Sequence, residues 1–212
     1  MKRRTLDILF STGGLVLAGL LLIVGIVLNS NANFAKTYVA DQLGEQHISF
    51  TPADQLSDEE KKAACLVENA GKPLTTGKQA ECYANEYIGL HLKNIAGGKT
   101  YADMGDVQSD LRAQVAKAQE TNAANLADLQ KQLDAANAQR DSLFKGETLR
   151  GLLLTSYGFS VFGEKAAQAV LVAFIAAGLL LLLSIAGLIH AFITPRSKGF
   201  AVPEPDKVTV NA

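Results

Sequence analysis

The side chains that could support chemistry are few: two cysteines, Cys65 and Cys82, and three histidines, His47, His91 and His190. Sixteen residues separate the cysteines, which fits neither a two-residue redox motif nor, without further cysteines, a four-thiolate zinc site. In an oxidising compartment we expect one disulfide, which would stabilise the domain by roughly 3 kcal/mol in the chain-entropy model. In a reducing compartment both would stay thiols and pack as small apolar side chains. The compartment therefore decides their chemistry.

Metal chemistry has one candidate set of residues. A non-haem iron oxygenase needs a facial set such as two histidines and one carboxylate. His47 and His91 could meet near Glu45, Glu81 or Glu86 in a folded domain, although histidines beside lysines and acids are more often surface residues. Phosphate-loop and serine-elbow motifs are missing from the sequence, and basic residues do not cluster as in nucleic-acid-binding proteins. We therefore predict no catalytic residue, no metal, no cofactor and no nucleic-acid partner.

Two long apolar segments must position everything else. Residues 8–28 and 169–189 each run for 21 residues without a charge, which is enough to cross a hydrocarbon core of ~30 Å as a helix. A buried helix of a soluble protein is the alternative, but such helices rarely run this long without a polar face. We predict transmembrane helices at 8–28 and 166–193, with the lipid bilayer as a partner.

Basic residues at the start of the chain predict the topology. Lys2, Arg3 and Arg4 directly precede the first span, which places the N-terminus, residues 1–7, in the cytoplasm. Two spans return a disordered tail, residues 194–212, to the same side. The central segment, residues 29–165, is then extracytoplasmic, where the cysteines form a disulfide. A secretory signal cleaved after Ala32 is the alternative, and it would leave the central segment outside as well.

Local patterns place the cysteines on two helices. Ser57 and Glu60 have capping-box spacing before a helix that ends at Gly71, so Cys65 is expected in the middle of that helix. A second helix carries Cys82 and ends at the glycine pair 97–98. The disulfide would then clamp a helical hairpin.

Residues 106–145 contain neither proline nor glycine and predict one unbroken helix of ~60 Å. Apolar residues recur along it at spacings of three and four, apart from a polar interruption at Asn122 and Asn125. This seam could pair with another chain as a coiled coil or pack on its own domain, and the pattern favours neither. The seam residues are Leu111, Val115, Leu126, Leu129 and Leu133.

Two further patterns concern the membrane. Residues 147–163 are mostly apolar with aromatic residues and glycines, which is typical of a segment at the membrane interface. Small residues line both spans and permit close helix contact, either between the two spans or in an oligomer. They are Gly14, Ala18, Ala169, Ala173 and Ala177.

Three stretches, VADQL, LTTGKQAECYANEYIGLHLKNIAGGKTYADM and TLRGLLLTSYGFSVFGEKA, carry a family resemblance. The chain resembles an uncharacterised family of actinobacterial two-span membrane proteins, from Ala40 onward apart from residues 106–145 and the tail. Members often carry an automatic label of aromatic ring-opening dioxygenase. The resemblance implies a two-span fold and an envelope location, and it supplies no catalytic residue.

We therefore expect an all-α membrane protein in which two transmembrane helices flank a helical, disulfide-clamped extracytoplasmic domain. Its expected function is non-enzymatic: the domain contacts another membrane protein of the cell envelope or associates with itself. The alternative is an extracytoplasmic enzyme or ligand-binding domain. Polar residues clustered around a pocket with His47 or His91 would favour the alternative, and a solid domain with an exposed apolar seam would favour the first.

Overall fold

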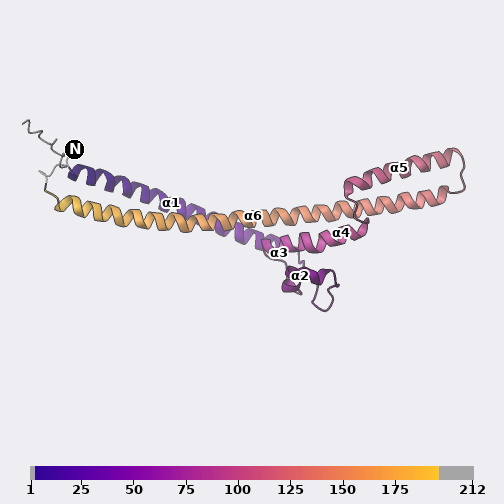
Figure 1. Cartoon of the computed structure of the whole chain (residues 1–212), viewed down its shortest axis with the longest axis horizontal. Helices are drawn as coiled ribbons and strands as arrows, with labels where there is room; N and C mark the ends of the chain where they lie inside the picture. The colour runs from indigo at the N-terminus through magenta and orange to yellow at the C-terminus, as the bar shows by residue number, and fades with distance from the viewer. Residues whose placement is uncertain (1–2, 196–212) are drawn as a thin grey trace, which may run out of the picture. The chain divides into compact units, whose positions relative to one another are not determined.

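The computed structural model describes residues 3–195, and these are helical without any named strand, as predicted. An isolated antiparallel bridge joins Ser49 to Pro73. Lys2 and nearly all of the predicted tail 194–212 lie outside the described residues. The helices, shown in Figure 1, are α1 Arg3–Gly44, the 3-10 turn η1 Glu60–Lys62, α2 Ala64–Asn69, α3 Gly77–Cys82, the π-helical turn η2 Tyr83–Ile88, α4 Gly89–Ile95, α5 Tyr101–Glu120 and α6 Leu126–Ile193.

The chain divides into two compact units. The first, which we call the helical pair, comprises Met1–Ala32 and Glu164–Ala212, and the second, the central domain, comprises Asn33–Gly163. α1 and α6 each contribute to both units. Both helices are long and apolar enough to cross a membrane by length and composition. The segments 8–28 and 169–189 lie inside them, and α1 passes through Ala32 without a break.

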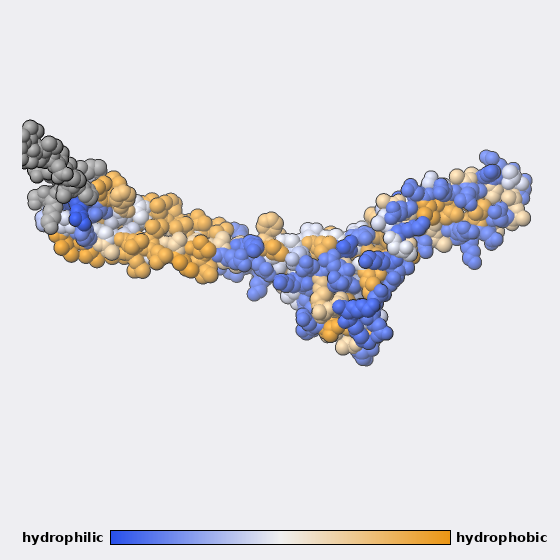
Figure 2. All heavy atoms as spheres, viewed as in Figure 1, coloured by the Kyte–Doolittle hydropathy of each residue, from blue (hydrophilic) through white to orange (hydrophobic). Residues whose placement is uncertain are grey.

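Polarity in the helical pair is reversed from that of a water-soluble core. Ser11 and Ser184 are buried between the helices together with Ala18 and Ala177, whereas most of the large apolar side chains face outward. Hydrophobic residues accordingly cover most of the visible surface of this unit in Figure 2. Large apolar side chains exposed on it include Leu9, Phe10, Val16, Leu20, Ile23, Ile26, Leu171, Val172, Ile175, Leu179, Leu182, Leu183 and Ile189.

Small residues let the two helices approach closely in antiparallel order. A Cβ atom built on Gly14 would collide with the Ser184 hydroxyl, and one built on Gly187 would collide with the Ser11 hydroxyl. A Cβ atom on Gly25 would lie 2.6 Å from the ring of Phe174. Four of the predicted packing residues belong to this interface: Gly14, Ala18, Ala173 and Ala177. The fifth, Ala169, is exposed, and the next residue, Val170, is buried instead.

The core of the central domain gathers apolar residues from most segments of the domain. Leu66 of α2, Leu74 and Leu143 of α6 are its most deeply buried large side chains. Fifteen buried residues form this main core, and they come from the end of α1, from the loop before η1, and from α2 to α6. Burying each leucine contributes about 1.5–3 kcal/mol, so this cluster is the main source of the domain's stability.

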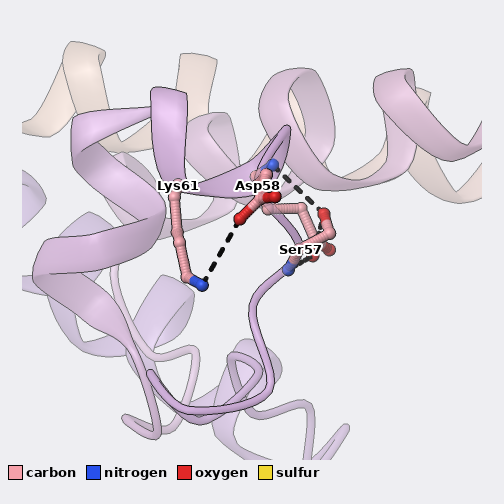
Figure 3. Close-up of polar contacts among 4 residues, drawn as sticks. Ser57, Asp58 and Lys61 are labelled. Atoms are coloured by element: carbon pink, nitrogen blue, oxygen red, sulfur yellow. Dashed lines mark hydrogen bonds and ion pairs between the residues drawn. The ribbon is translucent and has the colours of Figure 1, made fainter.

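The first predicted helix of the hairpin is shorter than its capping signal suggested. The backbone N–H of Ser57 donates to Glu60 Oε2 at 2.7 Å, and the N–H of Glu60 donates to Ser57 Oγ at 3.2 Å, so the capping box is present. Figure 3 shows the neighbouring ion pair between Lys61 Nζ and Asp58 Oδ1 at 3.8 Å. Extended backbone at Ala63 interrupts the helix after η1. Cys65 therefore lies at the start of α2, and its predicted position in mid-helix is wrong.

The second helix begins at a cap that the sequence analysis missed. Thr76 and Gln79 form a reciprocal capping box at the start of α3. α3, η2 and α4 then follow one another without a gap, and the positive φ angles of Gly97 and Gly98 end the helix as predicted. The predicted disulfide between Cys65 and Cys82 is confirmed; it joins α2 to α3 with a Cα–Cα distance of 6.1 Å.

The predicted single helix over 106–145 is wrong. α5 ends at Glu120, and α6 begins at Leu126 after a turn in which Asn122 adopts a φ of 50°. Asparagine tolerates this left-handed conformation better than most residues, so the polar interruption in the seam is a turn. The Gln108 side chain bonds to Asn137 and accepts a hydrogen bond from Arg140, which ties α5 to α6. The predicted interfacial segment 147–163 is helical throughout, as part of α6.

Candidate binding cleft

The five predicted seam residues pack within their own chain, four of them inside the α5–α6 hairpin. Val115 and Leu129 are buried together with Ala118, and Leu126 and Leu133 pack at the edge of this small cluster. The remaining seam residue, Leu111, packs against the main core. Folding back at the turn lets the two halves of the seam cover each other, which removes from water the apolar surface that a partner helix would otherwise cover.

The histidines do not assemble a metal site. His47 has a φ of 51° in the turn that follows α1. His91 stacks on Tyr87 with 4.4 Å between ring centroids, and its Nδ1 lies 2.8 Å from the Tyr87 carbonyl oxygen. Across residues 3–195, no three His, Cys, Asp or Glu side chains are grouped so that they could hold a metal ion. The candidate set with Glu45, Glu81 or Glu86 therefore does not form.

A charged cleft of about 450 Å³ opens on the central domain instead. This volume falls within the range of ~300–1,000 Å³ typical of small-molecule sites. Four segments line it: residues 59–63 around η1, residues 85–93 from η2 and α4, the turn 98–100, and three residues of α6. The α6 residues are Leu143, Glu147 and Arg150.

A π-helical turn shapes the wall formed by residues 85–93. The N–H of Gly89 donates to the carbonyl of Ala84, five residues earlier, so this hydrogen bond spans one residue more than that of an α-helix. Such π turns occur frequently at functional sites. A Cβ atom built on Gly89 would lie 4.0 Å from Arg150 Nε, so the glycine leaves space beside the guanidinium.

Arg150 is the most firmly held charge in the cleft. Its Nη1 donates to Glu147 Oε2 at 3.3 Å, and its Nη2 donates to Asn85 Oδ1 at 3.1 Å. Its Nε is shielded from solvent and has no hydrogen-bond partner. A guanidinium carries five N–H donors, so three remain without a protein acceptor.

Five other charged side chains of the cleft are exposed. Lys62, Lys93 and Lys99 line it together with Glu59 and Glu86, and all five are exposed. None of them forms an ion pair with another residue of the described chain. The buried side chains of Leu92 and Leu143 supply apolar lining between the charges.

Perturbed titration in the central domain has structural causes. The pKa of Glu60 lies below its ordinary value because the Ser57 hydroxyl and backbone N–H both donate to its carboxylate. The pKa of Asp103 is lowered in the same way by Thr100, in the capping box of α5. Burial, and secondarily Tyr87, raises the pKa of Tyr83. These groups cap helices or pack in the aromatic stack, and none of the three lines the cleft.

A second hollow, of about 410 Å³, lies over the disulfide. Asn85 and Glu86 line both hollows, so the π turn stands between them. Sequence reasoning missed the cleft because its walls come from four separate segments and follow no spacing motif. No acid–base or nucleophile motif surrounds Arg150 in the sequence, so the sequence did not mark it as a binding residue.

No protein-family model matches the chain, and no curated protein or solved structure matches it significantly. The resemblance to an actinobacterial two-span family therefore stays a prediction.

Proposed function

We propose that this is a two-span integral membrane protein whose central domain lies outside the cytoplasm and serves as a non-enzymatic interaction module. The spans are residues 8–28 and 166–193, and both termini are cytoplasmic. The partner is another envelope membrane protein or a second copy of the chain.

The reversed polarity of the helical pair carries this proposal. Only 17% of the most apolar window of α1 and 22% of that of α6 are buried, so most of their leucine, isoleucine and valine surface is left uncovered. In water, such a surface would far exceed the few hundred Å² that soluble monomers expose in one patch. Lipid solvates it without cost, and the serine and glycine contacts inside the pair are typical of transmembrane packing.

The disulfide supports the proposed side of the membrane. Cys65 and Cys82 are joined, and no free cysteine exists among the described residues. Disulfides persist outside the cytoplasm, where thiols are not kept reduced. The basic residues before α1 support the same orientation, because positive flanks stay in the cytoplasm.

The central domain offers two surfaces for a partner. One is the charged cleft, and the other is the outer face of the α5–α6 hairpin, where exposed residues are mostly polar. The seam leucines are engaged within the hairpin, so contact through them would require the hairpin to open. Binding through the polar outer faces requires no such opening.

A topology experiment tests the proposal. A reporter that is active only in the exported compartment, fused after residue 100, should be active, and tags on both termini should resist external protease. The chain should also remain in the membrane fraction after alkaline carbonate extraction. A cytoplasmically active reporter at residue 100 would overturn the location, and release by carbonate would overturn membrane insertion.

The cleft favours a second candidate function, which is binding of a small ligand by the exported domain. Its volume, the firmly held Arg150 and the unpaired lysines and glutamates around it are the observations in favour. Neither His47 nor His91 lines this cleft, so the proposed ligand contacts do not involve them.

A further inference from the structure

We propose that the cleft binds a small zwitterion of the amino-acid or short-peptide class, with the ligand's carboxylate on Arg150 and its ammonium group on Glu59 and Glu86. The ligand class named here rests on the second candidate function, which is binding of a small ligand in this cleft. It does not depend on which side of a membrane the domain occupies.

Arg150 provides the anion-binding end. Glu147 takes one N–H of Nη1 and Asn85 takes one N–H of Nη2, so each of these nitrogens keeps a second N–H for a ligand. Because both partners already hold the guanidinium, little side-chain freedom remains to be lost on binding. Planar guanidinium groups bind carboxylates through paired N–H donors, and Arg150 keeps one such donor on each terminal nitrogen.

The mixture of charges decides between a zwitterion and a simple ion. The cleft carries four basic groups, Lys62, Lys93, Lys99 and Arg150, and three carboxylates, Glu59, Glu86 and Glu147. A polyanion would meet Glu59 and Glu86, and a cation would meet the lysines. A ligand with both charges satisfies both sets, and Lys93 and Lys99 add attraction for its carboxylate.

The lining between the charges suits a small aliphatic body. Leu92 and Leu143 contribute apolar surface, and Gly89 and Gly98 have no side chains that would fill the cleft. The ligand's side chains would lie against this surface while its two ends reach opposite charges. A site of about 450 Å³ accommodates a ligand of this size class.

Titration of the full chain in detergent micelles with the dipeptide alanyl-alanine tests the proposal, with binding followed by NMR of arginine Nε–H groups. The Arg150 resonance should shift saturably, while that of Arg140 should not. Arg140 is a matched control, because its Nε is also shielded without a partner but its guanidinium stacks on Tyr101, outside the cleft. N-acetylated and C-amidated alanyl-alanine should each bind at least about tenfold more weakly, as expected when a charged hydrogen bond is lost.

Variants separate ligand binding from folding. Arg150→Gln and the exposed Glu86→Gln should each weaken alanyl-alanine binding about tenfold or more, whereas the exposed Glu120→Gln on α5 should not. Circular dichroism would show that each variant stays folded. Absence of saturable binding, or equal binding of the C-amidated form, would overturn the proposal. Tighter binding of inorganic phosphate than of the dipeptide would show a simple anion site instead.

Discussion

The small apolar cluster of the α5–α6 hairpin can be opened by three substitutions, Leu126→Lys, Leu129→Lys and Leu133→Lys. Leu129 is 9% exposed, and Leu126 and Leu133 are half-buried beside it. Full burial of a leucine contributes about 1.5–3 kcal/mol, so one full and two half burials contribute about 3–6 kcal/mol. Lysine at these positions loses that contribution and must take its charge to water.

The loss of stability should be confined to the α5–α6 hairpin. Its cluster contains three buried residues, whereas the main core contains fifteen, so the main core should remain folded. Hydrogen exchange of the chain in detergent should show amide protection in 112–133 reduced by about 10²–10⁴-fold, with α3 and α4 unchanged. A control with Ala127→Lys, Gln130→Lys and Ala138→Lys adds the same charge on the exposed face and should leave protection intact.

Two results would refute this reasoning. If amide protection in 112–133 is retained while the particle in detergent falls from an oligomer to a monomer, the seam joins two chains and the coiled-coil prediction holds. If neither protection nor size changes, the seam is not a packing surface at all.

Three further perturbations test other parts of the fold. Replacing Cys65 and Cys82 by alanine should lower the free energy of unfolding by roughly 3 kcal/mol and should therefore lower the melting temperature of the central domain. Reductant should lower the melting temperature of the wild type by an equal amount. The lowered pKa of Glu60 makes its contribution to stability complete above about pH 4.5 and lost as the pH falls through the folded value, so Glu60→Gln should flatten the acid side of the melting profile. Gly14→Val should disrupt the helical pair through its clash with the facing serine, whereas Gly13→Val, which has nothing within 4 Å, should not; melting in detergent compares them.

Features decided by local sequence were predictable. A run of residues without charge predicted each apolar helix, and Gly97 and Gly98 predicted the end of α4, because these signals act within a few residues. The disulfide followed from the expected compartment and from the presence of only two cysteines. Each of these expectations needed no knowledge of distant parts of the chain.

Features decided by packing were not predictable. The turn at Asn122 lies in a segment with good helix formers on both sides, and contacts between α5 and α6, such as the burial of Val115 with Leu129, favour folding back. Ala169 shares the four-residue spacing of Ala173 and Ala177, yet the interface turns away from it. The cleft around Arg150 depends on four segments meeting, which no local pattern encodes.

The exposure of leucines along α6 supports the proposed lipid environment for the second part of this helix. In its first part some leucines are buried and others are not: Leu143 is 1% exposed and Leu153 is 3% exposed, whereas Leu152 is 62% exposed. Further along, no leucine of α6 beyond Leu153 is buried, and Leu171 is 62% exposed and Leu182 is 67% exposed while Ala177 is fully buried. In water, each exposed leucine would forgo about 1.5–3 kcal/mol that burial in place of alanine could supply. Lipid removes that penalty, because its tails are as apolar as leucine. Small residues at the helix–helix interface are then favoured, because they let the two helices pack closely. The lack of buried leucines in α6 beyond Leu153 supports the proposed change of solvent along this helix. Leu182→Lys should therefore impair membrane insertion, whereas the same lysine at the exposed Gln168 should not; carbonate extraction compares the two, and equal retention of both variants would contradict the argument.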